Sequence, residues 1–187
     1  GIYFSADEDG NFVIAGTAPD SPAEKAGIKE GDIIKLVAVA IVYRKSQVDE
    51  AVCEEFGYVI VESFCNSSTI VTNVGDLLIG HFYECENGWR DRFATYFVDW
   101  LKAKGLNAEY TDNDILVDGY KVCGLAITRY GRIDYTSVFI GINTNLDHIK
   151  QICRKPMKKV PKGLSEYGIT TEEIEEMFLD FCEGDSV

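Results

Sequence analysis

Hydrophobic residues in two long stretches of this chain recur at the spacing of an amphipathic helix. In 89–104 the apolar positions Phe93, Phe97, Trp100 and Leu101 recur three or four residues apart, and Gly105 follows. Thr170-Thr171-Glu172-Glu173 opens a last helix, whose apolar face comprises Ile174, Met177, Phe178 and Phe181. Three shorter helices are predicted: one that Ser21 and Pro22 open and Gly27 ends, one over 46–56 before Gly57, and one over 145–152.

Most other apolar residues lie in short β-prone runs that turn residues separate. These predicted strands are 1–5, 12–16, 33–43, 58–64, 69–72, 77–83, 109–111, 115–117, 121–128 and 134–141, and 163–167 is predicted to be a loop. The strands outnumber the helices and arrive in hairpins, while the helices fall between groups of strands. This pattern predicts an α+β fold, a largely antiparallel sheet with helices on one face.

One predicted hairpin, residues 113–124, carries a lysine at a defined place. Ile115, Leu116 and Val117 form strands readily, and Asp118-Gly119 is a strong signal for a tight hairpin turn. Lys121 begins the second strand, where its ammonium can meet a phosphate or a carboxylate as a compact point charge. The hairpin therefore points to an anion site, with a solvated surface lysine as the alternative.

The charge of the chain narrows the possible partners. Its 187 residues fit one domain of ordinary size, and 31 acidic against 18 basic residues give a net charge of -13. Such an acidic surface repels nucleic acid and anionic lipid, so neither is expected as a partner. A basic segment between positions 154 and 162 contrasts with this background, and it is either a docking patch for a protein partner or a solvated loop. Its cations are Arg154, Lys155, Lys158, Lys159 and Lys162.

The cysteines and histidines predict no metal site. Six cysteines are scattered without a CxxC pair, which suits buried, reduced thiols in the cytoplasm better than a disulfide framework. With only two histidines, His81 and His148, a Cys/His zinc site is not expected. No apolar run reaches the roughly 18 residues that a membrane helix needs, so no membrane partner is predicted either.

The first part of the chain resembles a piece of a PDZ domain. The resemblance rests on the run from Ser21 to Ile34, Ser-Pro-Ala-Glu-Lys-Ala-Gly-Ile-Lys-Glu-Gly-Asp-Ile-Ile, which is close to that family's helix-turn-strand signature. It covers about residues 1–37, roughly half of a PDZ fold, and the chain from Leu36 onward does not continue it. We therefore expect a PDZ-like segment at 1–37 that is not an independent domain, followed by a second domain at 38–187.

Most of the remaining chain, about residues 33–170, resembles the catalytic domain of lipoate- and biotin-protein ligases. That family has a hairpin of the type Asn-Asp-Leu-Leu-Val-Asp-Gly-Arg-Lys-Ile-Ser-Gly, which stands here as Asn113 to Gly124. The chain from Ile142 to Ile169 also resembles the strand, short helix and loop that follow this hairpin. The resemblance implies a catalytic role for Lys121, which would hold acyl and phosphate oxygens of an acyl-adenylate. The expected ligand-binding residues are Asn113, Asp114, Gly119 and Gly124 of this hairpin and Asn66, Ser67 and Ser68 of an earlier loop.

The ligand loop of the family is altered in this chain. Its pattern is of the type Arg-Arg-x-Ser-Gly-Gly-Gly-x-Val-Tyr-His-Asp, and the counterpart is Glu62 to Asn73. Both arginines are missing, Glu62 brings a negative charge, and Asn66-Ser67-Ser68 replaces the three glycines. Removing one preorganised donor of this kind typically costs about 3–4 kcal/mol of transition-state stabilisation. Several such losses would reduce adenylation by many orders of magnitude.

Three functions remain open on this basis. The first is a non-catalytic, pseudoenzyme form of the ligase domain that serves binding or assembly, with a protein partner. The second is an active ligase that uses ATP to attach lipoate or biotin to a lysine of a carrier protein. The third is an octanoyl acyltransferase with a cysteine nucleophile, for which Cys65 and Cys123 are the candidates. The altered loop favours the first; ATP and lipoate or biotin would be needed only for the second.

Overall fold

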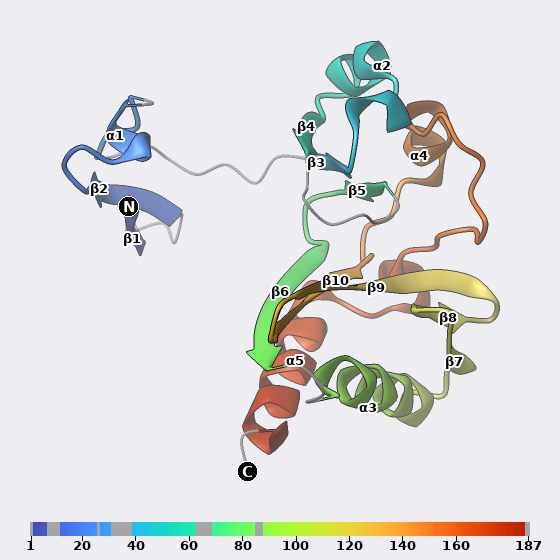
Figure 1. Cartoon of the computed structure of the whole chain (residues 1–187). Coiled ribbons are helices and arrows are strands. Elements are labelled where there is room, and N and C mark those ends of the chain that lie inside the picture. Colours follow the sequence, from blue (N-terminus) through green and yellow to red (C-terminus); the bar gives the residue numbers. More distant parts are fainter. Residues whose placement is uncertain are drawn as a thin grey trace. The chain divides into compact units, whose positions relative to one another are not determined.

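The computed structural model of the chain describes residues 2–6, 12–25, 27–30, 39–62, 69–84 and 88–185. Its contacts divide the chain into two compact units, Gly1–Leu36 and Val37–Val187 (Figure 1). The division lies next to the boundary expected at residue 37. That residues 1–37 are a PDZ-like segment and not an independent domain stays a prediction.

The first unit is a hairpin with one helical turn. Strands β1 (Ile2–Ala6) and β2 (Phe12–Thr17) pair antiparallel, with an irregularity between Tyr3 and Phe4. Helix α1 (Pro22–Lys25) begins as predicted, because Ser21 Oγ accepts a hydrogen bond from Glu24 N at 3.2 Å and proline occupies the first helical position. Gly27, at φ 81°, follows the helix.

A five-stranded antiparallel sheet is the centre of the second unit. Its strands lie in the order β6-β10-β9-β8-β7. Their bounds are Leu77–Glu84 (β6), Ala108–Thr111 (β7), Asp114–Val117 (β8), Tyr120–Tyr130 (β9) and Ile133–Ile140 (β10). Asp118 and Gly119 join β8 to β9 with φ values of 51° and 81°, as a type I′ turn requires.

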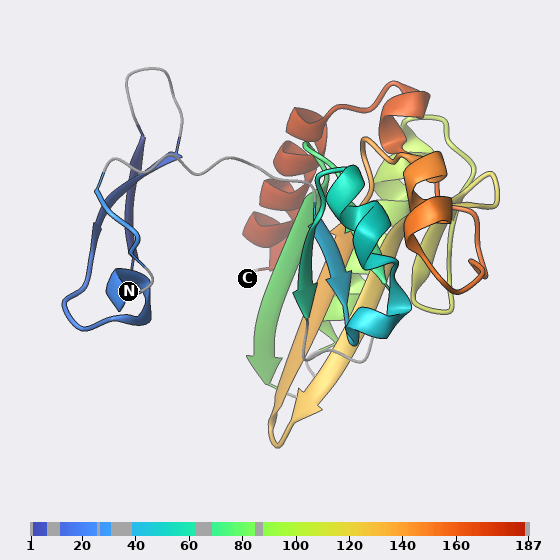
Figure 2. The same cartoon turned by 90° about the horizontal axis from the view of Figure 1, so that it is seen from above.

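Two long helices cover one face of this sheet. They are α3 (Trp89–Ala103) and α5 (Thr171–Asp185), which Figures 1 and 2 show together on the same side. Their apolar faces bury Phe93, Phe97, Leu101, Ile174 and Met177, each 1% exposed or less. Both helices therefore form as the 3,4 spacing predicts, and the α+β fold with a largely antiparallel sheet is confirmed.

A smaller layer lies on the opposite face of the large sheet (Figures 1 and 2). It contains a three-stranded sheet in the order β4-β3-β5, two helices and a 3-10 turn. Its own core includes Val42, Val48, Cys53, Tyr58 and Ile152. The elements are β3 (Val39–Val42), η1 (Lys45–Gln47), α2 (Glu50–Glu55), β4 (Val59–Glu62), β5 (Ile70–Thr72) and α4 (Leu146–Ile152).

The smaller layer differs from the sequence-based picture in two respects. The helix predicted over 46–56 starts only at Glu50, because Asp49 Oδ1 accepts hydrogen bonds from Ala51 N and Val52 N and so acts as its N-cap. Strands β4 and β5 do not pair with each other: β3 lies between them, parallel to β4 and antiparallel to β5. A third difference lies outside this layer, where the predicted loop 163–167 contains the 3-10 turn η2 (Leu164–Tyr167).

Candidate functional site

The backbone of Lys121, at the start of β9, lies between β8 and the segment before η2. On one side it lies opposite Leu116 of β8, next to an irregularity in the β8–β9 register. On the other side, Lys121 N donates to Val160 O at 2.9 Å, and Lys162 N donates to Lys121 O at 3.0 Å. The backbone that carries the predicted lysine is therefore fixed between a strand and the segment before η2.

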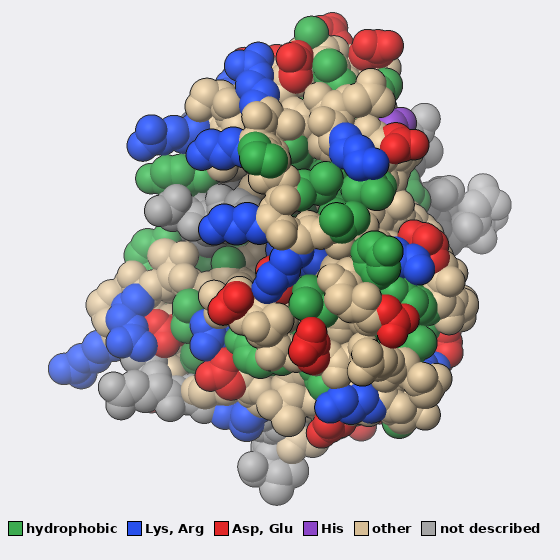
Figure 3. Space-filling view, turned by 90° about the vertical axis from the view of Figure 1, so that its right-hand side faces the viewer, with side chains coloured by type: hydrophobic (Ala, Val, Ile, Leu, Met, Phe, Trp, Pro, Cys, Tyr) green, Lys and Arg blue, Asp and Glu red, His purple; other side chains and the backbone are tan. Residues whose placement is uncertain are grey.

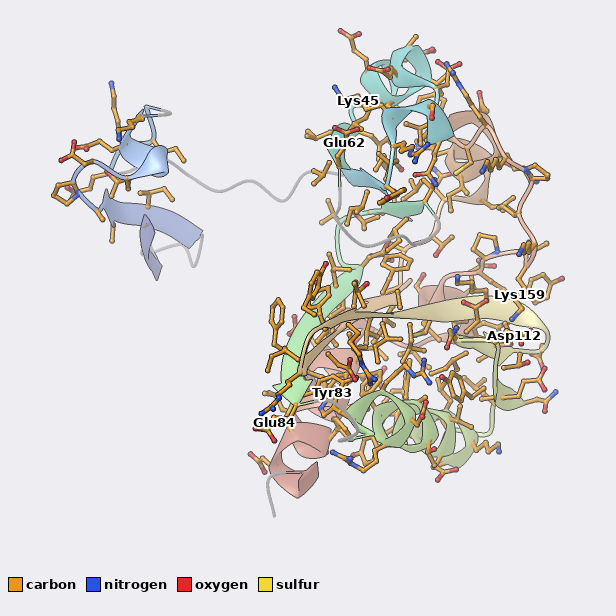
Figure 4. The ribbon with its side chains drawn as sticks, viewed as in Figure 1. Lys45, Glu62, Tyr83, Glu84, Asp112 and Lys159 are labelled. Atoms are coloured by element: carbon orange, nitrogen blue, oxygen red, sulfur yellow. The ribbon has the colours of Figure 1, made fainter. Side chains whose placement is uncertain are left out.

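The Lys121 side chain shares one carboxylate with a second lysine. Lys121 Nζ lies 2.7 Å from Asp114 Oδ1, and Lys159 Nζ lies 3.1 Å from Asp114 Oδ2. Lys159 Nζ also donates to Thr111 O at 3.1 Å and lies 3.9 Å from Asp112 Oδ2 (Figure 4). The structure thus brings the predicted pair Lys121 and Asp114 together, and it adds Lys159, which sequence reasoning placed in the basic segment and not in the site.

The absence of a side chain at Gly124 leaves room for the Lys121 ammonium. A Cβ atom at Gly124 would lie 3.0 Å from Lys121 Nζ and 3.6 Å from Asp114 Oδ1. Gly124 also pairs with Asp114 across the strands. A side chain at position 124 would therefore compete with the ammonium for the space in front of Asp114.

Asn113 and Gly119 act through the turns that bound β8. Asp112 and Asn113 have φ values of 50° and 66°, which makes the β7–β8 connection a second turn with positive φ at both positions. Asn113 Oδ1 accepts a hydrogen bond from Arg90 Nη1 at 2.9 Å, which ties this turn to the start of α3. Among the described residues, neither Asn113 nor Gly119 is seen to contact Lys121. Their role is therefore to shape the hairpin.

Cys123 lies in the core and does not face the solvent. It is 0% exposed, and burial raises the pKa of its thiol, although the nearby Lys121 charge acts in the opposite direction. A nucleophilic cysteine needs a thiolate that its substrate can reach, so both facts weigh against this role. Cys65 and the Asn66-Ser67-Ser68 turn, the other predicted site residues, lie outside the described residues.

The strands that flank the ligand-loop region carry no cation. From Ser46 to Trp89 the sequence contains neither Lys nor Arg. Glu62, at the end of β4, is exposed and accepts a hydrogen bond from Lys45 N at 3.3 Å (Figure 4). The Glu62 carboxylate is therefore hydrogen-bonded to the backbone of η1, the turn before α2.

Asp76 is a structural residue that sequence reasoning missed. Its Oδ1 accepts hydrogen bonds from Ile142 N at 2.6 Å and Asn143 N at 2.7 Å, and its Oδ2 accepts one from Asn73 N at 2.7 Å. Burial raises the pKa of this carboxyl group, and the hydrogen bonds act in the opposite direction. Asp76 thereby joins the β5–β6 turn to the loop after β10. The signal in the sequence is an Asn-x-Gly-Asp turn, which does not reveal a partner 66 residues away.

The described residues offer no metal centre. Among them, no group of three or more His, Cys, Asp or Glu side chains could hold a metal ion. His148 instead stacks on Phe56 with ring centroids 4.1 Å apart, and its Nδ1 lies 3.2 Å from Tyr58 Oη. No helix within the described ranges is long and apolar enough to span a bilayer.

A lysine hairpin on the antiparallel sheet of an α+β domain is the arrangement of the lipoate and biotin ligase class. The family model of the lipoyl protein ligase A/B catalytic domain matches residues 44–180, and the chain belongs to this family. A search of curated proteins gave no match.

Solved structures of lipoate ligases share the fold. A bi-partite lipoate protein ligase from Thermoplasma acidophilum, studied with its E2 lipoyl domain, is 13% identical, with a TM-score of 0.68 over 79% of this chain and 67% of that one. Lipoate-protein ligase A bound with ATP is 15% identical, with a TM-score of 0.66 over 79% and 68%. LipL1 of P. falciparum, in complex with lipoate, is 17% identical, with a TM-score of 0.64 over 87% and 55%. The chain thus spans between about half and two thirds of these proteins.

Proposed function

We propose that this chain is a non-catalytic member of its family, a binding module that holds a carboxylate-headed ligand at Lys121 and does not activate it with ATP. The observation that carries the proposal is the charge of the site. Lys121 and Lys159 share the single carboxylate of Asp114, while Ser46 to Trp89 contributes no Lys or Arg.

Adenylation requires more positive charge than these residues supply. The reaction joins a carboxylate to the α-phosphate of ATP and expels pyrophosphate, so charge develops on several phosphate oxygens at once. Enzymes stabilise such charge with preorganised cations and N–H donors, and a single donor contributes about 3–4 kcal/mol. In the ligases that this chain resembles, the arginines of the ligand loop are candidates for that role; this chain has Glu62 instead.

The charge that remains suits a monoanion. The side chains of Lys121, Lys159 and Asp114 sum to a formal net charge of +1, which the exposed Asp112, 3.9 Å from Lys159 Nζ, reduces further. A carboxylate that carries one negative charge balances this sum, whereas a triphosphate exceeds it. Lipoate, octanoate or biotin are the carboxylic acids that we expect as ligands.

An active lipoate- or biotin-protein ligase is the second candidate. The arrangement of Lys121, Asp114 and Gly124 favours it, because an ammonium held by a neighbouring carboxylate is preorganised for a reacting anion. The carrier protein would then supply the acceptor lysine. An octanoyl acyltransferase with Cys123 as nucleophile is less favoured, since that thiol is buried.

Calorimetric titration separates the first two candidates. The protein is titrated with lipoate, octanoate and biotin, with ATP, and with a non-hydrolysable lipoyl-adenylate analogue. A binding module is expected to bind at least one of the acids, to bind ATP weakly or not at all, and to gain little from the adenylate part of the analogue. Lys121→Ala should abolish binding of the acid.

Two outcomes would overturn the proposal. Binding of the analogue that is a thousandfold or more tighter than binding of the acid, and that requires Lys121, would mean that the adenylate site is intact. Failure of all three acids to bind would contradict the proposal that Lys121 binds a carboxylate ligand.

The cytoplasmic location remains part of this proposal. Cys53, Cys123 and Cys153 are free thiols, which is the state that a reducing compartment maintains. Mass spectrometry of the purified protein under non-reducing conditions tests this state, and a disulfide between any two of them would argue against it.

A further inference from the structure

A groove of about 630 Å³ lies between α3 and α5 on the surface of the second unit. From α3 its lining includes Asp91, Tyr96 and Asp99, and from α5 it includes Asp180, Phe181 and Gly184. Figures 1 and 2 show the two helices together on the side of the large sheet that lies away from the smaller layer. The groove therefore shares no lining residue with the Lys121 site, and it is large enough to hold side chains of a partner.

The floor of the groove is aromatic. The centroids of the Tyr96 and Phe181 rings lie 5.4 Å apart, and Phe181 is 5% exposed. At the α5 end, Gly184 leaves the helix backbone bare, and a Cβ atom there would meet nothing within 4 Å. The floor thus offers apolar contact, with room for an additional side chain.

The rim of the groove is acidic. Asp91, Asp99 and Asp180 are exposed, and Arg92 is the one cation among the described residues that line the groove. Arg90 forms a salt bridge with Asp91 at 2.9 Å, whereas the carboxylates of Asp99 and Asp180 form none with another described residue. These two carboxylates are therefore available to an external cation.

Helix stability does not explain the acidity of α5. Cations stabilise the C-terminal end of a helix, because the negative end of the helix macrodipole lies there, and acidic residues destabilise it. The last turn of α5 nevertheless contains Glu183 and Asp185 and no base, and the whole helix lacks Lys, Arg and His. On the face that Figure 3 shows, in contrast, Lys and Arg side chains lie among Asp and Glu side chains. The acidity of α5 is therefore local, and it opposes the stability of the helix that carries it, as is expected where residues serve a function.

We propose that the groove between α3 and α5 docks a basic segment of a partner protein, with an Arg or Lys side chain in the groove. Charge complementarity selects this partner. The cationic group meets the carboxylates of the rim, and its aliphatic stem lies on the Tyr96 and Phe181 rings. The net charge of -13 also attracts a basic segment from a distance and raises its association rate, whereas it repels an acidic segment. This docking needs neither a carboxylic acid nor ATP, so it does not depend on the proposed function.

The test is fluorescence anisotropy with a short labelled peptide in which Arg alternates with Leu and Ala, and with the same peptide carrying Glu in place of Arg. We expect only the Arg peptide to bind, and its affinity should fall as salt rises, because the attraction is screened. Asp99→Asn/Asp180→Asn should bind it about tenfold more weakly or worse, because two charges that face the partner are lost. The matched control is Glu54→Gln/Glu55→Gln, which removes two exposed charges from α2. It should bind nearly like the unchanged protein.

An uncharged substitution separates docking in the groove from a general attraction to an acidic protein. Gly184→Leu keeps the net charge and puts a side chain into the groove, so it should weaken binding of the Arg peptide several-fold. Circular dichroism checks that each variant is folded.

Four results would overturn the inference: no binding of the Arg peptide, equal loss in the two double variants, full affinity in Gly184→Leu, or displacement of the peptide by an equal concentration of spermidine. The last result would identify a small polyamine as the occupant of the groove. None of these results bears on the Lys121 site, because the measurement contains no carboxylic acid and no ATP.

Discussion

At the scale of single residues, the absence of a side chain at Gly124 decides where the Lys121 ammonium lies. The ammonium occupies the space where a Cβ of residue 124 would lie 3.0 Å away. Gly124→Ala should displace the flexible lysine from Asp114 at little cost in stability, about 1 kcal/mol or less, because a partly exposed ion pair contributes little to folding. Binding of the carboxylate ligand should weaken several-fold.

Two measurements on Gly124→Ala check this expectation. Thermal unfolding reports the stability, and calorimetric titration reports the affinity for the acid. Unchanged affinity in the variant would show that the position of the ammonium does not matter for binding.

Cys123 provides a second test at this scale. Burial raises the pKa of its thiol, so at pH 8 the group is protonated, and it is also inaccessible. Iodoacetamide reacts with thiolates, and we expect it to label Cys123 only after the protein is unfolded. Peptide mapping by mass spectrometry measures the labelling. Rapid labelling of Cys123 in the folded protein would restore it as a candidate nucleophile.

At the scale of the elements, one carboxylate joins two connections of the fold. Asp76 accepts three backbone hydrogen bonds, two of them from the loop after β10. Asp76→Asn keeps one acceptor oxygen but turns an amide N–H group toward N–H donors. We expect a loss of about 2–3 kcal/mol in the free energy of unfolding, as for hydrogen bonds to a charged group.

Urea denaturation measures this loss. The matched control is the same substitution at Asp99, an exposed residue of α3. Asp99→Asn should alter the free energy of unfolding by no more than about 0.5 kcal/mol. A similarly small effect for Asp76→Asn would mean that the two connections do not depend on the carboxylate.

Gly163 shows how closely the start of η2 packs on the end of the large sheet. A Cβ at Gly163 would lie 2.4 Å from Ile142 O, and backbone atoms cannot move aside as a side chain can. Gly163→Ala should therefore destabilise the protein by about 2 kcal/mol or more. Gly184→Ala is the control: it lies in α5 with nothing within 4 Å of the new Cβ, so it should be neutral or stabilising by up to about 1 kcal/mol. Equal effects of the two variants on urea unfolding would contradict this account.

The elements that the sequence predicts correctly are those fixed by local interactions. The spacing of Phe93, Phe97 and Leu101 predicts α3, and Asp118-Gly119 predicts the hairpin that carries Lys121. Contacts between distant segments leave no such local signal. Strands β3 and β4 are parallel and joined through α2, while β5 pairs with the other edge of β3. Lys159 reaches Asp114 from a separate part of the chain. The sequence therefore predicts the hairpin that carries Lys121, but it gives no signal that Lys159 shares the same carboxylate.

At the scale of the whole molecule, the fold indicates an enzyme, whereas the charge of the site indicates a binding module. The domain belongs to a catalytic family, whereas the cations that remain near Lys121 balance only a monoanion. Function lies in the site more than in the fold, so the charge of the site has the greater weight. We therefore expect a domain that still binds the carboxylic acid but no longer activates it with ATP.

Replacing Glu62 separates this interpretation from a single-residue defect. Glu62→Arg reverses one charge at the end of β4, but it restores only one of the features that the altered loop lacks. We expect no ligase activity from this variant, measured as mass added to a lipoyl domain. Measurable lipoylation by Glu62→Arg would mean that one substitution alone had silenced the enzyme.

Release of pyrophosphate from ATP in the presence of lipoate tests the central claim most directly. The assay contains the unchanged protein, magnesium, ATP and lipoate, with an active lipoate ligase as the positive control. A binding module should release no more pyrophosphate than its Lys121→Ala variant. Lipoate-dependent release that disappears in Lys121→Ala would contradict the account and identify the chain as an active ligase.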